Sequence, residues 1–421
     1  MVGGKEARRA VITGIGAVSP NGVGREAFWR ATRAGGSGVR RISAFVEAGL
    51  SVQIGGQAAQ FNPLDHLEER DAPHVSRVVP LLLAAAAEAL QDAGLDPAAM
   101  DLEARRGISV LVGSGGGALE FVERQFSLYF SGRDRKCSVY TIPSSTLGTL
   151  ASEVSMRFGL RGFSHMISTG CTSSTDALGY ARQHIQCGTA DAVLCGGGDA
   201  PLSPLITRAF TLMKILTTSW NQAPERGSRP FSRDRDGFVL GEGSWMFMVE
   251  ELNHARARGA RIYGEIAGYG STCEAFHRVR LEESAEEPAR AMQMALKNAG
   301  LEAEQIDYVN LHGTATVLND RIETRAMKRV FGAAAYRIPM SALKSLIGHP
   351  QGACGAAGVA ATLLAMRDGQ LPPTANLDAP DPECDLDYVP EPGRRCALQH
   401  ALCNCIGFGS KNSALVLSAI A

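Results

Sequence analysis

Two distant stretches of this 421-residue chain end a helix-like pattern in nearly the same way. The segment A-L-Q-D-A-G-L-D-P-A-A-M-D at 89–101 is echoed by A-L-K-N-A-G-L-E-A-E-Q-I-D at 295–307. Each pattern closes at Ala-Gly-Leu, where glycine is the residue that most readily adopts the left-handed conformation beyond a helix end. Each then leads towards an apolar strand. The echo predicts two similar α/β halves that meet near residues 250–260.

Strand-like and helix-like segments alternate along the whole chain, which predicts an α/β fold. Strands are predicted at Ala10–Thr13, Ile108–Val112, His165–Ile167, Ala192–Cys195, Ile262–Ala267, Tyr308–Leu311 and Ala414–Ser418. Helices are predicted at 75–94, 144–158, 172–186, 285–299, 320–330 and 355–367. No low-complexity linker divides the chain. From the echo described above, we place the boundary between the halves at 255/256, giving 1–255 and 256–421.

Charge and hydropathy argue against nucleic-acid and membrane partners. The net charge is −1, from 42 basic and 43 acidic residues, so the chain has no global basic excess. The longest apolar stretch, Val78–Ala87, contains Pro80 and stops at Glu88, and it is too short for a membrane span. The segment at 11–22 is a glycine-broken strand and not the apolar core of a signal peptide. We expect a cytoplasmic protein.

The ten cysteines follow no regular spacing, so most should be reduced thiols and not parts of a disulfide framework. The C-N-C motif at 403–405 has no second Cys or His pair at zinc-finger spacing, and we predict no metal site.

One cysteine lies in a corner of small residues, S-T-G-C-T-S-S-T-D-A at 168–177. A predicted strand runs into this corner and a helix-like pattern leaves it. Cys171 should therefore lie at a helix N-terminus, where backbone N–H groups and the helix dipole favour a thiolate. A lone cysteine, however, is more often a buried structural residue.

Three further stretches could carry chemistry. V-N-L-H-G-T-A-T at 309–316 places His312 at the carboxyl end of a predicted strand, where open α/β sheets bind ligands. S-A-L-K-S-L-I-G-H-P-Q-G-A-C-G at 341–355 combines Lys344 and His349 with a glycine-rich entrance to a helix, and C-N-C-I-G-F-G-S-K-N at 403–412 flanks an aromatic residue with glycines. Each stretch taken singly has a plainer alternative. His312 could be a core or turn histidine, Lys344 could extend to the surface, and the stretch at 403–412 could be a simple hairpin turn.

The stretch T-G-I-G-A-V-S-P-N-G at 13–22 imitates a dinucleotide-binding loop and would suggest a reductase. Ser19 stands where the third glycine of the fingerprint belongs, and Pro20 follows where a helix should begin. The reductase interpretation is therefore disfavoured.

Together these motifs resemble the β-ketoacyl-acyl carrier protein synthases of the thiolase superfamily. The matches run in the family's order through the whole chain: the corner at Cys171, R-P-F-S-R-D-R-D-G-F-V-L-G-E-G at 229–243, H-G-T-x-T at 312–316, K-S-x-x-G-H at 344–349 and N-x-x-G-F-G at 404–409. The resemblance implies a thiolase-like fold of two pseudo-equivalent halves in five α/β/α/β/α layers. It also implies a dimer.

The same resemblance assigns roles to individual residues. It implies that Cys171 is the nucleophile and that Lys344 is the cation that supports a histidine pair, His312 and His349. It also implies that Phe408 is a gate residue, whose backbone N–H completes an oxyanion hole with that of Cys171. Thr314 and Thr316 match residues that contact the pantetheine arm. Glu323 matches a carboxylate near the lysine, although a helix-capping role beside Asp320 or Asn319 is an equal alternative.

The implied reaction is a decarboxylative Claisen condensation. An acyl group moves to the cysteine, a malonyl thioester loses carbon dioxide, and the resulting enolate attacks the acyl-enzyme. The resemblance implies no cofactor belonging to the chain itself, because the phosphopantetheine arm comes with the acyl carrier protein.

Departures from the fatty-acid pattern point to a particular branch of the family. The corner G-C-T-S-S-T-D-A and C-D-L-D-Y-V-P at 384–390 look like ketosynthase α chains of bacterial type II polyketide systems. Ala315, Val317 and the pair Ser410-Lys411 also differ from the common pattern. An elongating fatty-acid synthase remains the main alternative.

Two other members of the superfamily stay as alternatives. A degradative thiolase would use a second cysteine near the C-terminus, for which Cys403 or Cys405 could be mistaken. A non-catalytic chain-length factor would lack the nucleophile, and Cys171 excludes its usual form.

Two kinds of protein partner are expected. Carrier proteins are acidic, so basic residues should surround the pocket mouth. Arg208 and Lys214 are candidates, with a solvated helix face as the plain alternative. The second partner is either another copy of this chain or a ketosynthase-like chain-length factor. The small residues at 141–148 belong to a segment that lies near the acyl tunnel and the dimer interface in the family.

Overall fold

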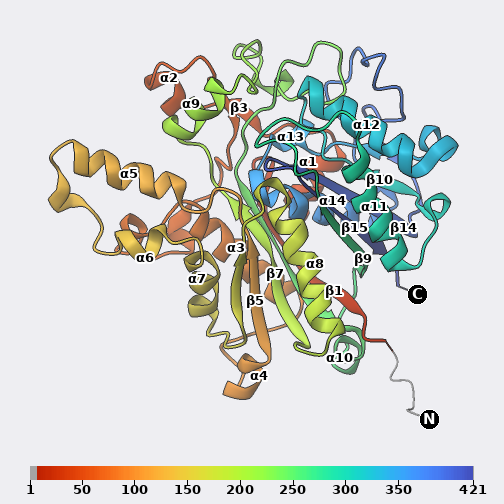
Figure 1. Ribbon diagram of the computed structural model, residues 1–421. Helices are drawn as coiled ribbons and strands as arrows, with labels where there is room; N and C mark the ends of the chain where they lie inside the picture. The colour runs from red at the N-terminus through yellow and green to blue at the C-terminus, as the bar shows by residue number, and fades with distance from the viewer. Residues whose placement is uncertain (1–6, 421) are drawn as a thin grey trace.

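The computed structural model describes residues 7–420 and shows one hydrogen-bonded central sheet of 11 strands surrounded by helices (Figure 1). The N-terminal half contributes β1 (Ala10–Ser19), β5 (Ile108–Gly113), β6 (Ser164–Ile167), β7 (Ala192–Asp199) and β8 (Gly243–Glu251). The C-terminal half contributes β9 (Gly264–Cys273), β10 (Tyr308–Asn310), β11 (Met340–Ser341), β14 (His400–Gly407) and β15 (Lys411–Ser418). Short strands are β2 (Gly22–Val23) beside β1, β3 (Val39–Arg41) with β4 (Ile54–Gly56), and β12 (Gln370–Leu371) with β13 (Arg394–Arg395).

The two halves repeat the same strand order and the same directions. The order β1-β8-β7-β5-β6 corresponds to β9-β15-β14-β10-β11. In each set the first two pairings are antiparallel and the last two are parallel. The halves join through β1 and β9, where Val11 pairs with Glu265 and Ile12 with Gly264. The fold therefore consists of two pseudo-equivalent halves.

Helices lie between the two halves of the sheet and on both outer faces. The helices are α1 (Arg25–Arg33), α2 (Ser43–Glu47), α3 (Val78–Asp92), α4 (Leu102–Arg106), α5 (Leu119–Phe130), α6 (Thr141–Ser145), α7 (Thr149–Phe158), α8 (Ser173–Gln186), α9 (Pro204–Leu212), α10 (Leu252–Ala257), α11 (Glu286–Ala299), α12 (Val317–Phe331), α13 (Lys344–Ile347) and α14 (Cys354–Asp368). The central helices α8 and α14 touch each other, and α8 packs on strands of both halves. Helices α3 and α7 cover the outer face of the first half, and α11 packs on β9 and β15 and on α12 at the other face. The predicted five-layered thiolase-like fold is confirmed.

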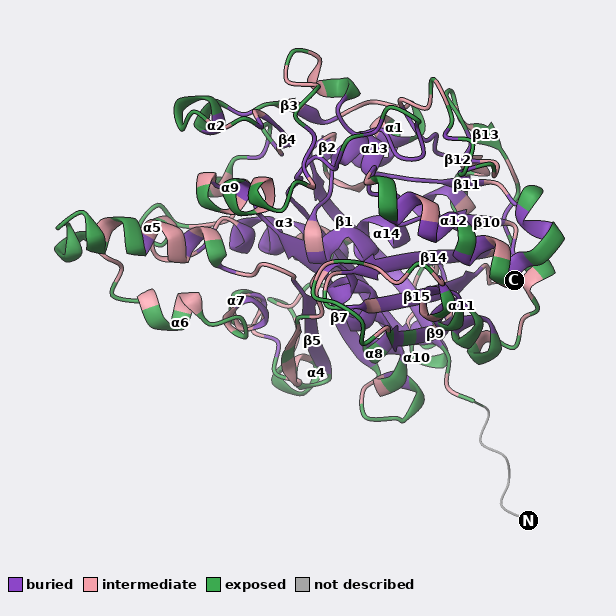
Figure 2. Ribbon diagram, turned by 45° about the horizontal axis from the view of Figure 1, so that its top comes forward, coloured by how far each residue is buried: buried purple, intermediate pink, exposed green. Residues whose placement is uncertain are grey.

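The sequence of the central layer explains its burial. Helix α14 reads C-G-A-A-G-V-A-A-T-L-L-A through its first 12 residues, and all of them are buried. A helix with no polar face is stable only when protein surrounds it. Figure 2 shows this layer and the strands beside it as the buried interior, with exposed residues on the outer helices and loops. The site described below therefore begins at the ends of rigid, fully packed elements.

A glycine pair in each half explains both the sequence echo and the false nucleotide-binding loop. A Cβ atom at Gly14 or Gly16 would lie about 2 Å from a carbonyl oxygen of α3. Gly268 and Gly270 stand in the same relation to α11. These glycines let a helix backbone lie directly on the sheet. The G-I-G motif is therefore the middle of a ten-residue strand and contains no helix-opening turn.

Most predicted elements exist, with different boundaries. The helix predicted at 144–158 is divided into α6 and α7, and β1 extends to Ser19. Strand β8 was not predicted, although G-S-W-M-F-M-V-E-E is buried at every position. Such a continuous apolar run has no alternating pattern, because both faces of the strand are covered. The boundary at 255/256 stays a prediction.

An arm formed by α5, the following loop and α6 projects from the body and is seen at the left of Figure 1. It carries a series of large apolar side chains that are more than a third exposed: Leu119, Phe126, Tyr129, Phe130, Val139, Tyr140, Ile142 and Leu147. We refer to these eight residues as the apolar arm. The nearby strand β6 is the outermost strand of its half and leaves one edge unpaired. Within residues 7–420, every helix is too short or too polar to cross a bilayer.

Candidate active site

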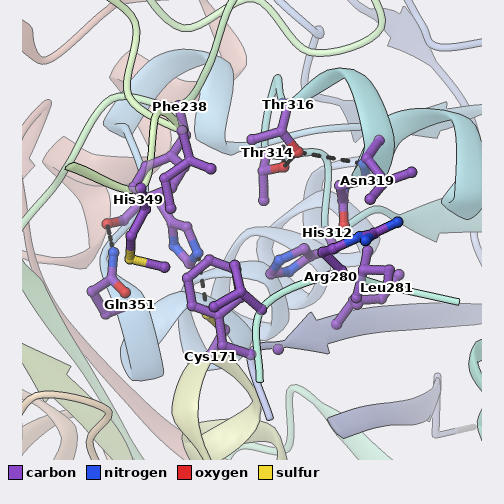
Figure 3. A pocket seen from close by; sticks show the side chains of 17 residues that line it. Cys171, Phe238, Arg280, Leu281, His312, Thr314, Thr316, Asn319, His349 and Gln351 are labelled. Carbon is purple, nitrogen blue, oxygen red and sulfur yellow. Dashed lines mark hydrogen bonds between the residues drawn. The ribbon is translucent and has the colours of Figure 1, made fainter. Parts of the chain in front are cut away.

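Four chain segments bring four of the five predicted catalytic residues, all except Lys344, to the wall of one cavity of about 220 Å³ (Figure 3). Cys171 lies in a 3-10 turn, Gly170–Thr172, between β6 and α8. His312 follows β10, and His349 follows α13. Phe408 lies in the turn between β14 and β15. All four residues line the cavity, although they are separated by up to 237 positions in sequence (408 − 171).

The nucleophile candidate is in contact with one histidine. Cys171 Sγ lies 3.3 Å from His349 Nε2, and both side chains are buried. Burial raises the pKa of the Cys171 thiol to about 12 and lowers the pKa of His349 well below its ordinary value. The resting pair is therefore a neutral thiol and a neutral imidazole. The expectation of a resting thiolate is wrong, because loss of solvation outweighs the favourable helix N-terminus.

The second histidine is fixed in one tautomer by a buried lysine. Lys344 Nζ donates to the backbone carbonyl of His312 at 2.5 Å and lies 3.3 Å from His312 Nδ1. An ammonium group can only donate, so Nδ1 must accept and the ring proton must be on Nε2. Burial and the charge of Lys344 lower the pKa of His312 well below its ordinary value, so the ring stays neutral. The arrangement presents a neutral Nε2–H donor.

His349 differs from His312 in this respect. Its Nδ1 has no hydrogen-bond partner among the described residues, so no protein group fixes the tautomer. The two rings stand nearly perpendicular, with centroids 5.4 Å apart and an interplanar angle of 85°. His349 can therefore accept a proton at Nε2 in one tautomer and donate from Nε2 in the other.

One backbone N–H group is directed at the sulfur of Cys171. The N–H of Phe408 donates to Cys171 Sγ. A Cβ atom on the neighbouring Gly407 would lie only 3.2 Å from the backbone nitrogen of Cys171. The N–H groups of Cys171 and Phe408 are thus close together, as an oxyanion hole requires. A residue larger than glycine at position 407 would move the N–H group of Phe408 away from that of Cys171.

Glu323 is connected to Lys344 only through the backbone of His312, and the helix-capping alternative predicted for it is wrong. Its carboxylate accepts the backbone N–H groups of His312 and Gly313 at 2.7 and 2.8 Å, and the side-chain amide of Asn404 at 2.7 Å. It forms no ion pair with Lys344 and caps no helix; Thr316 caps α12 instead. Burial raises the pKa of the Glu323 carboxyl to about 7. Glu323 therefore fixes the backbone that presents His312.

The two threonines line the cavity beside His312. Thr314 Oγ1 and Thr316 Oγ1 lie 3.0 Å apart, and Thr316 Oγ1 also accepts the N–H of Asn319. Figure 3 shows them on the same side of the cavity as Arg280. Their place is compatible with contact to an extended substrate arm, and that role stays a prediction.

The proposed docking residues lie outside the cavity wall. Arg208 on α9 and Lys214 are both exposed, and Lys214 stands between the cavity-lining residues Met213 and Ile215. Arg280 is an exposed residue that lines the cavity itself and was not predicted. Its signal in the sequence was R-V-R at 278–280, between a strand and a helix.

The turn that carries Phe408, the predicted gate residue, is connected to the loop that carries Arg280. Ser410 Oγ accepts the backbone N–H groups of Phe276 and His277, and Gly409 N donates to the carbonyl of Arg278 at 2.9 Å. The departure at Ser410 therefore joins the Phe408 turn to the loop at 274–284.

Two of the remaining cysteines lie beneath the nucleophile and not in the cavity. Cys405 Sγ lies 3.2 Å from the carbonyl oxygen of Cys171, and Cys354 Sγ lies 3.3 Å from it. Cys403 instead contacts Thr362. Neither Cys403 nor Cys405 lines the cavity, which disfavours the thiolase interpretation. Sequence spacing did not predict that His312 Nδ1, Cys354 Sγ and Cys405 Sγ all lie within 4.8 Å of one another, a group that could hold a metal ion.

Comparison with known proteins assigns the chain to a family. Residues 7–255 match the beta-ketoacyl synthase N-terminal domain, and residues 263–378 match the C-terminal domain. The chain belongs to the β-ketoacyl synthase family. The predicted family, the enzyme class and its condensing chemistry are thereby confirmed.

Curated relatives of this β-ketoacyl synthase come from polyketide and fatty-acid systems. It is 43% identical to a putative polyketide beta-ketoacyl synthase 1 of Streptomyces halstedii, over 98% of both chains. It is 42% identical to the tetracenomycin polyketide synthase ketoacyl synthase alpha subunit of Streptomyces glaucescens, over 98% of this chain and 97% of that one. A 3-oxoacyl-[acyl-carrier-protein] synthase 2 of Rhizobium meliloti is 41% identical, over 97% of this chain and 98% of that one.

Solved structures of similar proteins contain carrier and partner chains. One is a type II polyketide ketosynthase in complex with its acyl carrier protein and bound to the hexaketide, with a TM-score of 0.89 and 33% identity over 99% of this chain and 100% of that one. Another is the ishigamide ketosynthase/chain length factor, with a TM-score of 0.90 and 30% identity over 99% of this chain and 100% of that one.

Proposed function

We propose that this β-ketoacyl synthase extends a Cys171-bound acyl chain with malonyl units from an acyl carrier protein, in bacterial type II polyketide biosynthesis. The observation that carries the proposal is the meeting of Cys171, His312 and His349 on one buried cavity, with Cys171 Sγ 3.3 Å from His349 Nε2. The polyketide assignment is supported by the Cys-Thr-Ser corner and by the polyketide relatives.

The first step transfers the acyl group to the cysteine. As Cys171 Sγ attacks the thioester carbonyl, its proton moves to His349 Nε2 at 3.3 Å. The carbonyl oxygen becomes an oxyanion that accepts the N–H groups of Cys171 and Phe408. Collapse of the tetrahedral intermediate breaks the bond to the pantetheine sulfur, which takes the proton back from His349. The carrier leaves as a free thiol.

The second step is the loss of carbon dioxide from malonyl thioester. The electrons of the broken C–C bond form an enolate, whose oxygen gains negative charge. His312 donates to that oxygen from Nε2–H, and His349 donates in its other tautomer. Neither imidazole needs to be charged, in accord with the lowered pKa values of both histidines.

The third step forms the new C–C bond. The enolate carbon attacks the acyl-Cys171 carbonyl, and the same two backbone N–H groups receive the oxyanion. Collapse of the tetrahedral intermediate breaks the C–S bond, Cys171 leaves as a thiolate that takes up a proton from solvent, and the β-ketoacyl group stays on the carrier. In this proposal the phosphopantetheine arm is part of the carrier protein and not a cofactor of this chain. We also propose that the reaction takes place in the cytoplasm.

The acyl chain has room beyond the cysteine. A second cavity of about 120 Å³ is lined by Gly115, Gly116, Asp199, Phe210 and other residues, and it shares Gln351 with the catalytic cavity. Leu119 of the apolar arm and the loop at 115–117 both contribute to its wall. This cavity supports a path for the growing chain from Cys171 towards the base of the apolar arm, where a partner on that arm would help to shape the tunnel.

We propose that a ketosynthase-like chain covers the apolar arm and the free edge of β6. Groups of large exposed apolar side chains, such as the apolar arm, are typical of protein interfaces. The polyketide relatives include an alpha subunit, and one similar structure pairs a ketosynthase with a chain length factor. We therefore favour a heterodimer with a paralogue that lacks the cysteine, with a homodimer as the alternative.

Reconstitution tests both the pathway and the partner. The chain is purified alone or with a cysteine-lacking paralogue and supplied only with malonyl-loaded carrier protein. We expect unreduced poly-β-keto products of defined length with the paralogue, and short or irregular products without it. A homodimer that makes full-length chains alone would exclude the heterodimer. A requirement for β-keto reduction between rounds would favour the elongating fatty-acid synthase suggested by the Rhizobium relative.

Charge reversal tests carrier docking, with Arg280 added to the predicted Arg208 and Lys214. Arg280→Glu should raise the apparent KM for carrier-bound malonyl groups about tenfold at low salt, because like charges repel an acidic carrier. The effect should shrink as salt screens the charges. A small malonyl thioester should react as before. Arg208→Glu and Lys214→Glu are measured in parallel, and an unchanged KM removes the residue concerned from the docking surface.

A further inference from the structure

Lys344 is a buried cation without a carboxylate partner. Its side chain is 5% exposed. Lys328 pairs with Asp385 at 2.5 Å, but no ion pair among the described residues includes Lys344. Glu323 is a buried carboxylate that could have balanced this charge, but its oxygens accept backbone N–H groups instead. An isolated buried charge costs several kcal/mol, so a counter-charge should lie nearby.

The groups next to the lysine that can become negative are thiols. Cys354 Sγ and Cys405 Sγ are 3.6 Å apart, and Cys405 Sγ lies 3.6 Å from the same His312 Nδ1 that Lys344 approaches to 3.3 Å. All four of these residues, and Cys171 as well, are at least nine-tenths buried. The cluster therefore places two thiols beside one unpaired ammonium.

The two thiols share one backbone acceptor and contact each other. Both point at a single acceptor, the carbonyl oxygen of Cys171, at 3.2 Å for Cys405 and 3.3 Å for Cys354. The two sulfurs also form a hydrogen-bonded pair at 3.6 Å, and His312 Nδ1 already receives the lysine. When Cys354 loses its proton, the S–H group of Cys405 can turn to the Cys354 sulfur, and the cluster gains a negative charge beside Lys344.

Cys354 is the better placed of the two to lose its proton. It is the first residue of the 15-residue helix α14, where the helix dipole favours an anion. Burial disfavours the charge, but the hydrogen bond from Cys405 and the ammonium of Lys344 outweigh it and lower the pKa of Cys354 to about 7. Asp199 opposes this from β7. Burial and Cys354 raise the pKa of Cys405 well above its usual range.

We propose that Cys354 is a positioning residue whose thiolate balances the buried ammonium of Lys344, while Cys405 keeps the remaining proton of the pair. The pair then holds Lys344 against His312 Nδ1 and keeps the Nε2–H of His312 directed at the substrate. The existence of the thiolate does not depend on the proposed function; only its effect on decarboxylation rests on it.

Ultraviolet difference spectroscopy detects the thiolate without any enzyme assay. Spectra of Cys171→Ala and of the double variant Cys171→Ala/Cys354→Ser are recorded across pH and subtracted. We expect one thiolate absorbance to appear as pH rises through about 7. The matched control replaces Cys403, a buried thiol with no lysine beside it whose pKa is raised to about 12, and Cys171→Ala/Cys403→Ser should keep the absorbance. No difference below pH 9 would overturn the proposal.

Two substitutions then separate charge from packing. Cys354→Ser keeps the size and one hydrogen bond but not the charge, whereas Cys354→Asp restores a negative charge. Malonyl decarboxylation should fall about tenfold in the serine variant at neutral pH, the size of one hydrogen bond, and should return towards the parent rate in the aspartate variant. The parent rate of decarboxylation should rise as pH increases through about 7, where Cys354 ionises, and this rise should be absent in the aspartate variant. Equal losses in both variants would show a purely structural cysteine.

Metal analysis and thiol counting of the purified protein test the two other uses of such a cluster. We expect no stoichiometric metal and no disulfide between Cys354 and Cys405. A zinc ion bound by His312 and the two cysteines, or a disulfide in the active enzyme, would overturn the proposal, because either one removes the free thiolate.

Discussion

Cys171→Ala abolishes acyl loading and lowers condensation by a factor on the order of 10⁶, the scale seen when an enzyme loses its nucleophile. The variant still decarboxylates malonyl thioester to a measurable extent, because His312 and His349 remain on the cavity wall. Intact-protein mass spectrometry after incubation with acyl carrier protein measures loading, and carbon dioxide release measures decarboxylation. The two readouts separate the steps that the geometry assigns to different residues.

The controls for this experiment are the two cysteines of the C-N-C motif. Cys403→Ser should load acyl groups like the parent enzyme, because Cys403 faces Thr362 and not the cavity. Peptide mapping of the loaded parent should place the adduct on Cys171. An adduct on Cys403 or Cys405, or product formation by Cys171→Ala, would show that the nucleophile is misassigned and would reopen the thiolase interpretation.

His312→Ala leaves acyl loading in place and lowers decarboxylation about 10²–10³-fold, the usual effect of removing one oxyanion donor. The physical reason is the tautomer that Lys344 imposes, since it leaves Nε2–H as the ring donor of His312, always available to the enolate oxygen. Loading should persist because the group in contact with the sulfur is His349, at 3.3 Å. Single-turnover loading and decarboxylation assays on the same preparation measure the two effects.

His349→Ala is the matched comparison. We expect it to impair both steps, because His349 receives the thiol proton in loading and donates in decarboxylation. His312→Gln should recover part of the decarboxylation lost in the alanine variant, since an amide N–H can replace the imidazole donor. If His312→Ala loses loading as strongly as decarboxylation, the division of roles between the two histidines is wrong.

Much of this enzyme can be read from short-range sequence features. The helix endings at 89–101 and 295–307 predicted the two halves, because the same glycine-terminated helix must pack on the same kind of strand in each. Cys171, His312, Lys344, His349 and Phe408 were found from motifs that each lie within a few residues. The resemblance then supplied their common purpose, since no single motif distinguishes a catalytic residue from a buried or turn residue.

The tertiary structure decided which protonation states and partners these residues have. Burial from several segments made Cys171 a thiol, contrary to the thiolate expected from its helix N-terminus alone. Glu323 turned out to accept the N–H groups of His312 and Gly313, a contact across 11 residues of sequence. Nothing in the sequence indicates that Cys354 and Cys405, 51 residues apart, lie 3.6 Å from each other beside a lysine without a carboxylate partner. Motifs record local backbone geometry, whereas desolvation and charge balance depend on everything that packs around a group, and only the folded chain specifies that.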